Sequence, residues 1–254
     1  MFDGECLPVK ILIIGESCRD VFHYGESVRL CPDAPVPVFK SLKISDNGGM
    51  AKNVQRNLQS LGCQTELITN GEWEQIRKTR YVDFRTNHMF LRVDENESTF
   101  GSLSVDRIEK LDRDSYDAVV VSDYNKGYLS EDVLSFISQW HPLVFLDTKK
   151  ILGPWAGEFT FIKINNAEFE ATEHTLSDNL RSRLIVTRGY RGSEFLGKIY
   201  TVQSVEVKDT SGAGDTFLSG LCYKYVETKD IVKAIKFGNS CSTKVVQKRG
   251  VSIL

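Results

Sequence analysis

Short apolar segments alternate with amphipathic ones through the second half of the chain, and this alternation limits the folds that the sequence can adopt. Residues 118–123 (AVVVSD) read as a strand buried on both faces. Residues 130–139 follow with a helical pattern that starts at a serine, a common capping residue. Residues 143–147 are strand-like again. Strands that alternate with helices predict an α/β fold with a largely parallel sheet.

The same patterns predict further elements along the chain. Residues 10–15 are a buried strand closed by glycine, and residues 50–61 are an amphipathic helix. The prolines of residues 34–39 make that segment extended, so it would be an edge strand or a flap. The other predicted strands are residues 65–69, 80–84, 89–94, 159–164 and 183–187, with extended pieces at 193–202 and 205–208. The other predicted helices are residues 167–172, 215–227 and 229–248.

The composition excludes several classes of protein. The formal net charge of -2 gives no electrostatic reason to expect nucleic acid as a partner. No apolar run approaches the ~20 residues that a membrane span needs, and the start of the chain lacks a secretory pattern. We therefore expect a cytoplasmic protein. Its cysteines show no C-x-x-C pair, so we expect neither a zinc site nor a disulfide framework but free, mostly buried thiols; they are Cys6, Cys18, Cys31, Cys63, Cys222 and Cys241.

The segment that points most directly to chemistry is DTSGAGDT, residues 209–216, between a strand-like piece and an apolar helix. Its small residues Gly212, Ala213 and Gly214 fall where the helix begins and the first amide groups lack intrahelical partners. Those amides can bind an anion, helped by the positive end of the helix dipole. Asp215 stands beside them. Phosphoryl transfer to an alcohol needs such donors and a carboxylate that takes the hydroxyl proton.

A plain glycine turn explains the same local pattern, with Asp215 only complementing the helix dipole. The chain has neither a G-x-x-x-x-G-K-[ST] loop nor a G-x-G-x-x-G loop of the protein-kinase type. Any use of a nucleoside triphosphate must therefore take another form.

Longer motifs favour a phosphoryl-transfer site over a plain glycine turn. Residues 209–220 (DTSGAGDTFLSG) resemble the C-terminal signature of the PfkB family of carbohydrate kinases. Three further motifs are similar to other motifs of that family and come in the family's order: Gly48-Gly49 with Asn53, Asn165-x-x-Glu168, and Thr187-x-Gly189. Within the family the chain looks most like the heptose 7-phosphate kinase domain of ADP-heptose synthesis. That match is carried by Asp20-x-x-x-Tyr24-Gly25, residues 29–38, residues 122–127, residues 147–149 and Arg92-x-Asp94.

The resemblance covers roughly residues 10–250 and implies a ribokinase-like three-layer sandwich. In that fold a mostly parallel central sheet carries a small β-flap, or lid. Here the lid would comprise about residues 20–39 and 80–94 of a single kinase domain over residues 1–254. The resemblance also implies ATP and Mg²⁺ as cofactors, and a homodimer that pairs through the flap. No nucleic acid or membrane partner is implied.

Functional roles follow from the resemblance, residue by residue. The catalytic base would be Asp215, and the amides of Gly212, Ala213 and Gly214 would form the anion hole. The residues facing the sugar would be Asp20, Gly48, Gly49 and Asn53. The residues along the nucleotide would be Lys149, Asn165, Glu168, Thr187, Gly189 and Asn239. Glu168 would also reach Mg²⁺, through water.

The implied reaction is the ATP-dependent phosphorylation of D-glycero-D-manno-heptose 7-phosphate to the 1,7-bisphosphate. The chain departs from the family after Asn70, where it runs almost directly into the next strand. Relatives place a long helix–strand–helix stretch there, near the sugar. Two alternatives therefore stay open. One is a kinase of this family that acts on another sugar or nucleoside, and the other is a trimmed, non-catalytic homologue that binds sugar or nucleotide.

Overall fold

The computed structural model describes residues 8–97 and 100–254. Its larger sheet has eight strands in the order β12-β11-β10-β9-β8-β7-β1-β4. All neighbours from β10 to β4 are parallel, whereas β11 and β12 are antiparallel, so the predicted largely parallel sheet is confirmed. The strands are β1 (Lys10–Gly15), β4 (Gln64–Ile68), β7 (Ala118–Asp123), β8 (Val144–Thr148), β9 (Phe161–Asn165), β10 (Leu184–Thr187), β11 (Ser193–Phe195) and β12 (Lys198–Tyr200).

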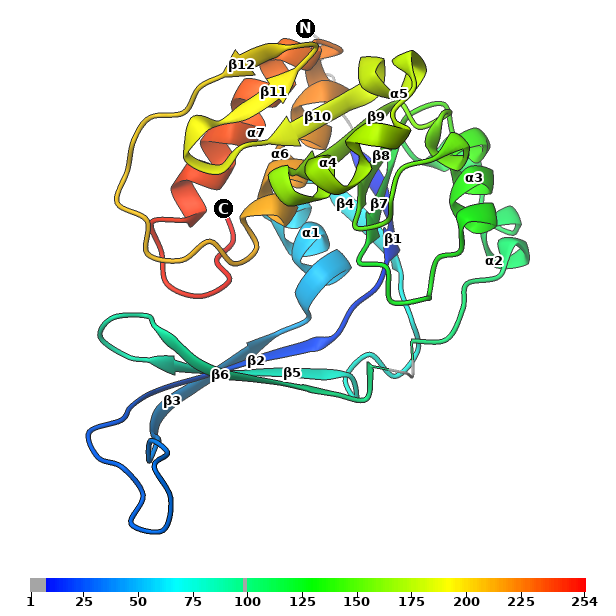
Figure 1. Ribbon diagram of the computed structural model, residues 1–254. Coiled ribbons are helices and arrows are strands. Elements are labelled where there is room, and N and C mark those ends of the chain that lie inside the picture. The colour runs from blue at the N-terminus through cyan, green and yellow to red at the C-terminus, as the bar shows by residue number, and fades with distance from the viewer. Residues whose placement is uncertain (1–7, 98–99) are drawn as a thin grey trace, which may run out of the picture.

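Helices cover both faces of this sheet and complete three layers (Figure 1). Successive residues of β1 point to opposite faces, so Ile11 and Ile13 pack into one apolar core and Leu12 and Ile14 into the other. The first core is covered by α1 (Gly49–Ser60), α6 (Ala213–Thr228) and α7 (Ile231–Val245). The second is covered by α2 (Val105–Glu109), α3 (Glu131–Trp140), α4 (Asn166–Thr172) and α5 (Asp178–Arg183). Short 3₁₀ turns lie at Arg113–Ser115, Pro154–Ala156, Glu173–Thr175 and Gly189–Arg191.

A second, four-stranded sheet projects from this body (Figure 1). We call it the lid sheet, and its order is β3-β2-β5-β6. The strands are β2 (Arg19–Glu26), β3 (Lys40–Asn47), β5 (Arg77–Asp83) and β6 (Met89–Glu95). The cross-strand register places Ile44, His23, Tyr81 and Leu91 in one row and therefore on one face, which we call the outer face. Ser45, Phe22, Arg80 and Arg92 form a row of the opposite, inner face.

The structure corrects several predicted elements. Residues 34–39 are predicted to be an edge strand or a flap, but they form no strand and contain only an isolated bridge from Pro37 to Leu30, and the edge strand on this side is β3. The prolines leave too few amide donors for a ladder. Residues 193–202 include a hairpin of two short strands, β11 and β12, rather than one extended piece, and the predicted extended piece at residues 205–208 joins no sheet. Helices α2 and α5 were not predicted at all.

The parallel strands fix where a site can form. The carboxyl ends of β7, β8, β9 and β10 lie at the same end of the main sheet, and loops leave the sheet there toward the helices. In open α/β sheets, ligands bind at the carboxyl ends of the strands. The residues that sequence motifs single out as catalytic lie at the start of α6, which packs against β7 and β8.

Candidate active site

The turn before α6 holds its main chain in a conformation that glycine adopts most readily. Gly212 precedes the helix with a φ of 77°, in the left-handed region. A Cβ at this residue would also lie 3.0 Å from Cγ1 of Val251. No side chain caps the start of α6. The first amide groups of the helix are therefore left without a side-chain acceptor.

Two of the three amides that the sequence singled out are open. Those of Gly212 and Gly214 make no hydrogen bond within the described residues, whereas the Ala213 amide donates to the carbonyl oxygen of Thr210 at 3.2 Å. Open amides at the positive end of a helix dipole can stabilise an anion. Of the three amides that the sequence singled out, the structure thus leaves two free and engages the third in the turn.

Asp215 lies one residue further, and its side chain is buried. One carboxylate oxygen accepts from Nδ2 of Asn53 at 3.2 Å, and the other accepts from the Tyr124 hydroxyl at 3.0 Å. Burial, together with the nearby charge of Asp147, raises the pKa of Asp215 to about 6, although Lys163 and the two hydrogen bonds act in the opposite direction. A carboxyl with that pKa is ionised at neutral pH and is a stronger base than an ordinary aspartate.

A buried ion pair stands beside Asp215. Nζ of Lys163 donates to Oδ2 of Asp147 at 2.7 Å, and both side chains are less than a tenth exposed. The other oxygen of Asp147 is buried and has no hydrogen-bond partner in the described structure. Both residues line the same cavity as Asp215 and Gly214. The cavity therefore holds an ammonium group and a free carboxylate oxygen within its catalytic end.

Sequence reasoning did not assign these two residues or Tyr124 to the site, although Asp147 and Tyr124 lie in motifs that it quoted. A signal for Lys163 was present, since a lysine interrupts the apolar strand FIKIN and a charge in a buried strand needs a partner. Its partner follows from the register of the sheet, in which Asp147 lies directly across from Lys163.

Most of the residues predicted to follow the nucleotide lie around this cavity, which has a volume of about 740 Å³. The lining includes Lys149, Asn165, Thr187, Gly189 and Asn239. Two of these side chains already make hydrogen bonds inside the fold: Nδ2 of Asn239 donates to Tyr200, and the Thr187 hydroxyl donates to Ile164. Val202, Val205 and Val207 add an apolar part to the lining. The cavity can thus hold a flat apolar group beside these valines and an anion beside the open amides and Lys163.

Glu168 does not line the cavity, but it contacts two residues that do. Oε2 accepts from the backbone amide of Asn165 at 2.7 Å, and the Asn165 side chain accepts from the Glu168 amide, which makes a capping box at the start of α4. Oε1 accepts from Nζ of Lys149 at 2.5 Å. Glu168 therefore positions Asn165 and Lys149, both of which face the cavity.

The four residues predicted to face the sugar are only partly brought to Asp215. Asn53 contacts its carboxylate directly. Gly49 has a φ of 54°, and a Cβ there would lie 3.6 Å from Cβ of Asp20, so these two residues are neighbours. Asp20 is buried and forms an ion pair with Arg80 of the lid sheet. Gly48 precedes α1 and packs against its own helix at Lys52.

The described cysteines are all free, as the sequence predicted, and all but Cys31 are buried; Cys6 lies outside the described residues. Within residues 8–97 and 100–254, no group of three His, Cys, Asp or Glu side chains could hold a metal ion by itself. No helix in the same ranges is long and apolar enough to cross a membrane.

Comparison with known proteins points to one family. Residues 155–254 match the model of the pfkB family of carbohydrate kinases. The bifunctional protein HldE of Helicobacter pylori strain J99 is 30% identical over 298 aligned residues, which cover 96% of this chain and 64% of that protein. The bifunctional protein HldE of Blochmanniella pennsylvanica is 27% identical over 291 residues, with 96% of this chain and 61% of that protein covered. The chain thus spans less than two thirds of the length of these relatives.

Solved structures agree in fold. Ribokinase from Thermotoga maritima superposes with a TM-score of 0.72 at 16% identity, covering 96% of this chain and 94% of that one. Ribokinase from Arabidopsis thaliana, solved with ribose and ATP, gives a TM-score of 0.69 at 14% identity and covers 96% and 94%. At such low identity the likeness shows the ribokinase fold, as the sequence predicted.

Proposed function

We propose that this chain is a carbohydrate kinase of the PfkB family, which transfers the γ-phosphoryl group of ATP to a sugar hydroxyl. The observation that carries the proposal is the pairing of buried Asp215 with the open amides of Gly212 and Gly214. A protein that only binds sugar or nucleotide has no need of a base with a raised pKa beside an anion site. As ATP is the phosphoryl donor of the cytoplasm, a cytoplasmic location is part of this proposal.

In this mechanism Asp215 takes the proton of the attacking sugar hydroxyl. Asn53 and Tyr124 hold the carboxylate in place through its two oxygens. The open amides and the ammonium of Lys163 would stabilise the charge on the transferred phosphoryl group, since pre-positioned donors need no reorganisation during the reaction. The raised pKa of Asp215 makes it a competent base near neutral pH.

The cavity suits ATP with Mg²⁺. The uncommitted oxygen of Asp147 is an acceptor for a metal-bound water, and both Glu168 oxygens keep lone pairs for water beyond their present bonds. Magnesium retains much of its hydration and needs few protein ligands, so the donor set fits. When bound, the ion would offset negative charge on the phosphates. Lys149, Asn165, Thr187, Gly189 and Asn239 would follow the nucleotide.

For the acceptor we propose D-glycero-D-manno-heptose 7-phosphate, phosphorylated to the 1,7-bisphosphate. The support is the resemblance to the heptose kinase domain, which is densest in residues 20–38 and 122–127, together with the similarity to the HldE proteins. Asp20, Gly48, Gly49 and Asn53 would face the sugar. Residues 1–254 would act as one kinase domain, with the lid sheet closing over the acceptor.

The acceptor is tested by comparing kcat/KM for heptose 7-phosphate, fructose 6-phosphate, ribose and adenosine in an assay of ADP release. We expect heptose 7-phosphate to give the highest value, with a raised KM and some turnover of hexose phosphates. The connection after Asn70 is short, and a missing apolar contact weakens discrimination by only about 1–3 kcal/mol. A clear preference for one of the other acceptors would overturn the heptose assignment but keep the kinase. No turnover of any of them would favour a binding protein.

We also propose that the lid sheet pairs with a second copy of the chain. On its outer face Leu42, Ile44, Leu91 and Val93 are between 38% and 60% exposed, and β3 and β6 are its edge strands. Apolar side chains next to free strand edges favour burial against another sheet. Sedimentation of the wild type is expected to show a dimer at micromolar concentration, and Ile44→Asp a monomer. Leu196→Asp is the control, since Leu196 is 67% exposed, against 60% for Ile44, but lies on the β11–β12 turn. A wild-type monomer would contradict the proposal.

A further inference from the structure

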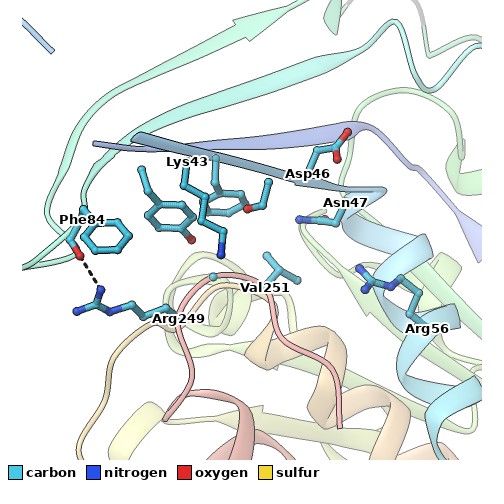
Figure 2. Close-up of a pocket in the computed structure, with 11 residues that line it drawn as sticks. Lys43, Asp46, Asn47, Arg56, Phe84, Arg249 and Val251 are labelled. Carbon is cyan, nitrogen blue, oxygen red and sulfur yellow. Dashed lines mark hydrogen bonds between the residues drawn. The ribbon is translucent and has the colours of Figure 1, made fainter. Parts of the chain in front are cut away.

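A second cavity, of about 290 Å³, lies between the inner face of the lid sheet and the segment of residues 249–251 (Figure 2). One wall of the cavity is apolar and consists of Phe22, Tyr24 and Phe84 on the lid side together with Val251. The polar lining comes from Lys43, Ser45, Asp46, Asn47, Arg56 and Arg249. Three of these side chains are cations, and they come from β3, α1 and the segment after α7. The cavity therefore combines parts of the chain that are far apart in sequence.

The lining is rich in donors that the fold does not use. Lys43 Nζ, the Arg56 guanidinium and Asn47 Nδ2 make no hydrogen bond or ion pair with any described residue, nor do the hydroxyls of Tyr24 and Ser45. Asn47 uses only its oxygen, which accepts from the Gly49 amide at 2.8 Å. Uncommitted donors that share one cavity favour a ligand with several acceptor oxygens.

The remaining charges of the lining are already in use. The carboxylate of Asp46 accepts from Nε of Arg19 at 2.7 Å. The Arg249 guanidinium donates to the carbonyl oxygens of Phe84 and Arg85, so it holds the lid while still contributing its positive charge. The cavity thus keeps a positive excess, and Figure 2 shows Lys43 extending from the lid toward Val251 between the two arginines. An anion gains from such surroundings.

The position of this cavity relates it to the catalytic base. Arg56 lies on α1 three residues after Asn53, which is about 4.5 Å along the helix axis, and Asn53 contacts Asp215. Val251 lines the cavity and lies against the position where Gly212 would carry a Cβ. Helix α1 and the contact between Gly212 and Val251 therefore connect this cavity with the catalytic cleft.

We propose that this cavity binds the phosphate group of a phosphorylated acceptor, with Lys43 and Arg56 as its ligands. The inference rests on the proposed kinase function and adds to it the place and the side chains that would hold the phosphate of the proposed acceptor. Phosphate has three strong acceptor oxygens and a charge of about −1.5 to −2 at neutral pH, which matches the free donors and the excess charge. The other end of the same sugar would present its hydroxyl to Asp215.

The test is the double variant Lys43→Gln, Arg56→Gln, with Lys40→Gln as the matched control. Lys40 is an exposed lysine of the same strand that does not line the cavity. The double variant is expected to raise the KM for heptose 7-phosphate roughly tenfold or more, because charge-assisted hydrogen bonds are lost. The KM for ATP and kcat are expected to stay within about twofold of the wild type, since no contact of the nucleotide cleft changes. Lys40→Gln is expected to leave all three unchanged.

A direct binding measurement separates this inference from the proposed function. Calorimetric titration with inorganic phosphate is expected to detect binding in the wild type and the control but much weaker binding in the double variant. Equal binding in all three proteins, or an equal rise in the KM for ATP and for the sugar, would overturn the phosphate site. Turnover of heptose 7-phosphate with an unchanged KM in the double variant would overturn it too while the kinase stands. Phosphate binding that depends on Lys43 and Arg56, without turnover of any sugar, would support the site and reject the proposed kinase.

Discussion

Replacing Asp215 by asparagine is expected to lower kcat by roughly 10²- to 10⁴-fold, the range for the loss of a general base. The amide keeps the size of the carboxylate and can still accept one of the two hydrogen bonds that Asn53 and Tyr124 donate. It cannot take the proton of the sugar hydroxyl. Nucleotide binding, measured by calorimetry, is expected to stay within a few-fold, because the residues along the nucleotide are unchanged.

The pH profile adds a second measurement on the same residue. Because the pKa of Asp215 is raised to about 6, the free base is lost as the pH falls through that value. The wild-type kcat/KM is therefore expected to be constant near pH 8 and to fall tenfold per pH unit well below pH 6, and the asparagine variant is expected to lose this dependence. Asp230→Asn makes the same chemical change at the start of α7 and is the control, since asparagine caps a helix as well as aspartate does. Near-normal turnover in Asp215→Asn would remove this residue from the base role.

Gly214→Val is expected to reduce kcat by roughly 10²- to 10³-fold, the effect of removing an oxyanion donor. The branched side chain would crowd the open amides at the start of α6. The structure adds a second cause, because a Cβ at Gly214 would lie 2.9 Å from Nζ of Lys163. Lys163 would have to move and would weaken its bond to Asp147. Both effects act on the same transferred phosphoryl group.

The fold of this variant is expected to persist, as judged by circular dichroism, because Gly214 has no left-handed φ that a side chain would strain. Gly71→Val serves as the control, since nothing lies within 4 Å of its Cβ position and Gly71 does not line the cavity that contains Asp215. A folded Gly214→Val protein with normal sugar phosphorylation would show that these amides do not bind the phosphoryl group.

The main sheet and the glycine turn at the start of α6 could be predicted because their signals are local. Most strands of the parallel sheet are short apolar runs, with β4 (QTELI) as an exception, and the glycines at the start of α6 are neighbours of Asp215 in the sequence. The lid was harder. Strand β3 (KSLKISDN) has only Leu42 and Ile44 as apolar residues, and nearly all of it is exposed, so its alternation is weak beside the prolines of residues 34–39.

The remaining parts of the site depend on contacts between distant residues. Asn53 and Asp215 are 162 positions apart, and no local pattern indicates that they share a hydrogen bond. The pair of Lys163 and Asp147 requires the register between β8 and β9. The cations of the second cavity come from residues 43, 56 and 249, each of which alone reads as an ordinary surface charge.

Strand β4 is the last strand at its end of the main sheet, and no described strand pairs with its outer side. The connection that follows it leads straight to the lid through a turn at residues 71–75. The charged residues of the candidate active site lie on β8, β9 and α6, and β7 and β1 stand between β8 and this edge. The alignment with the HldE protein of H. pylori extends over 298 residues, more than the whole of this chain, so that relative carries additional internal segments. At the free edge of β4 this fold can gain or lose a strand and its helix during evolution, because the order of the strands that carry the site residues does not change.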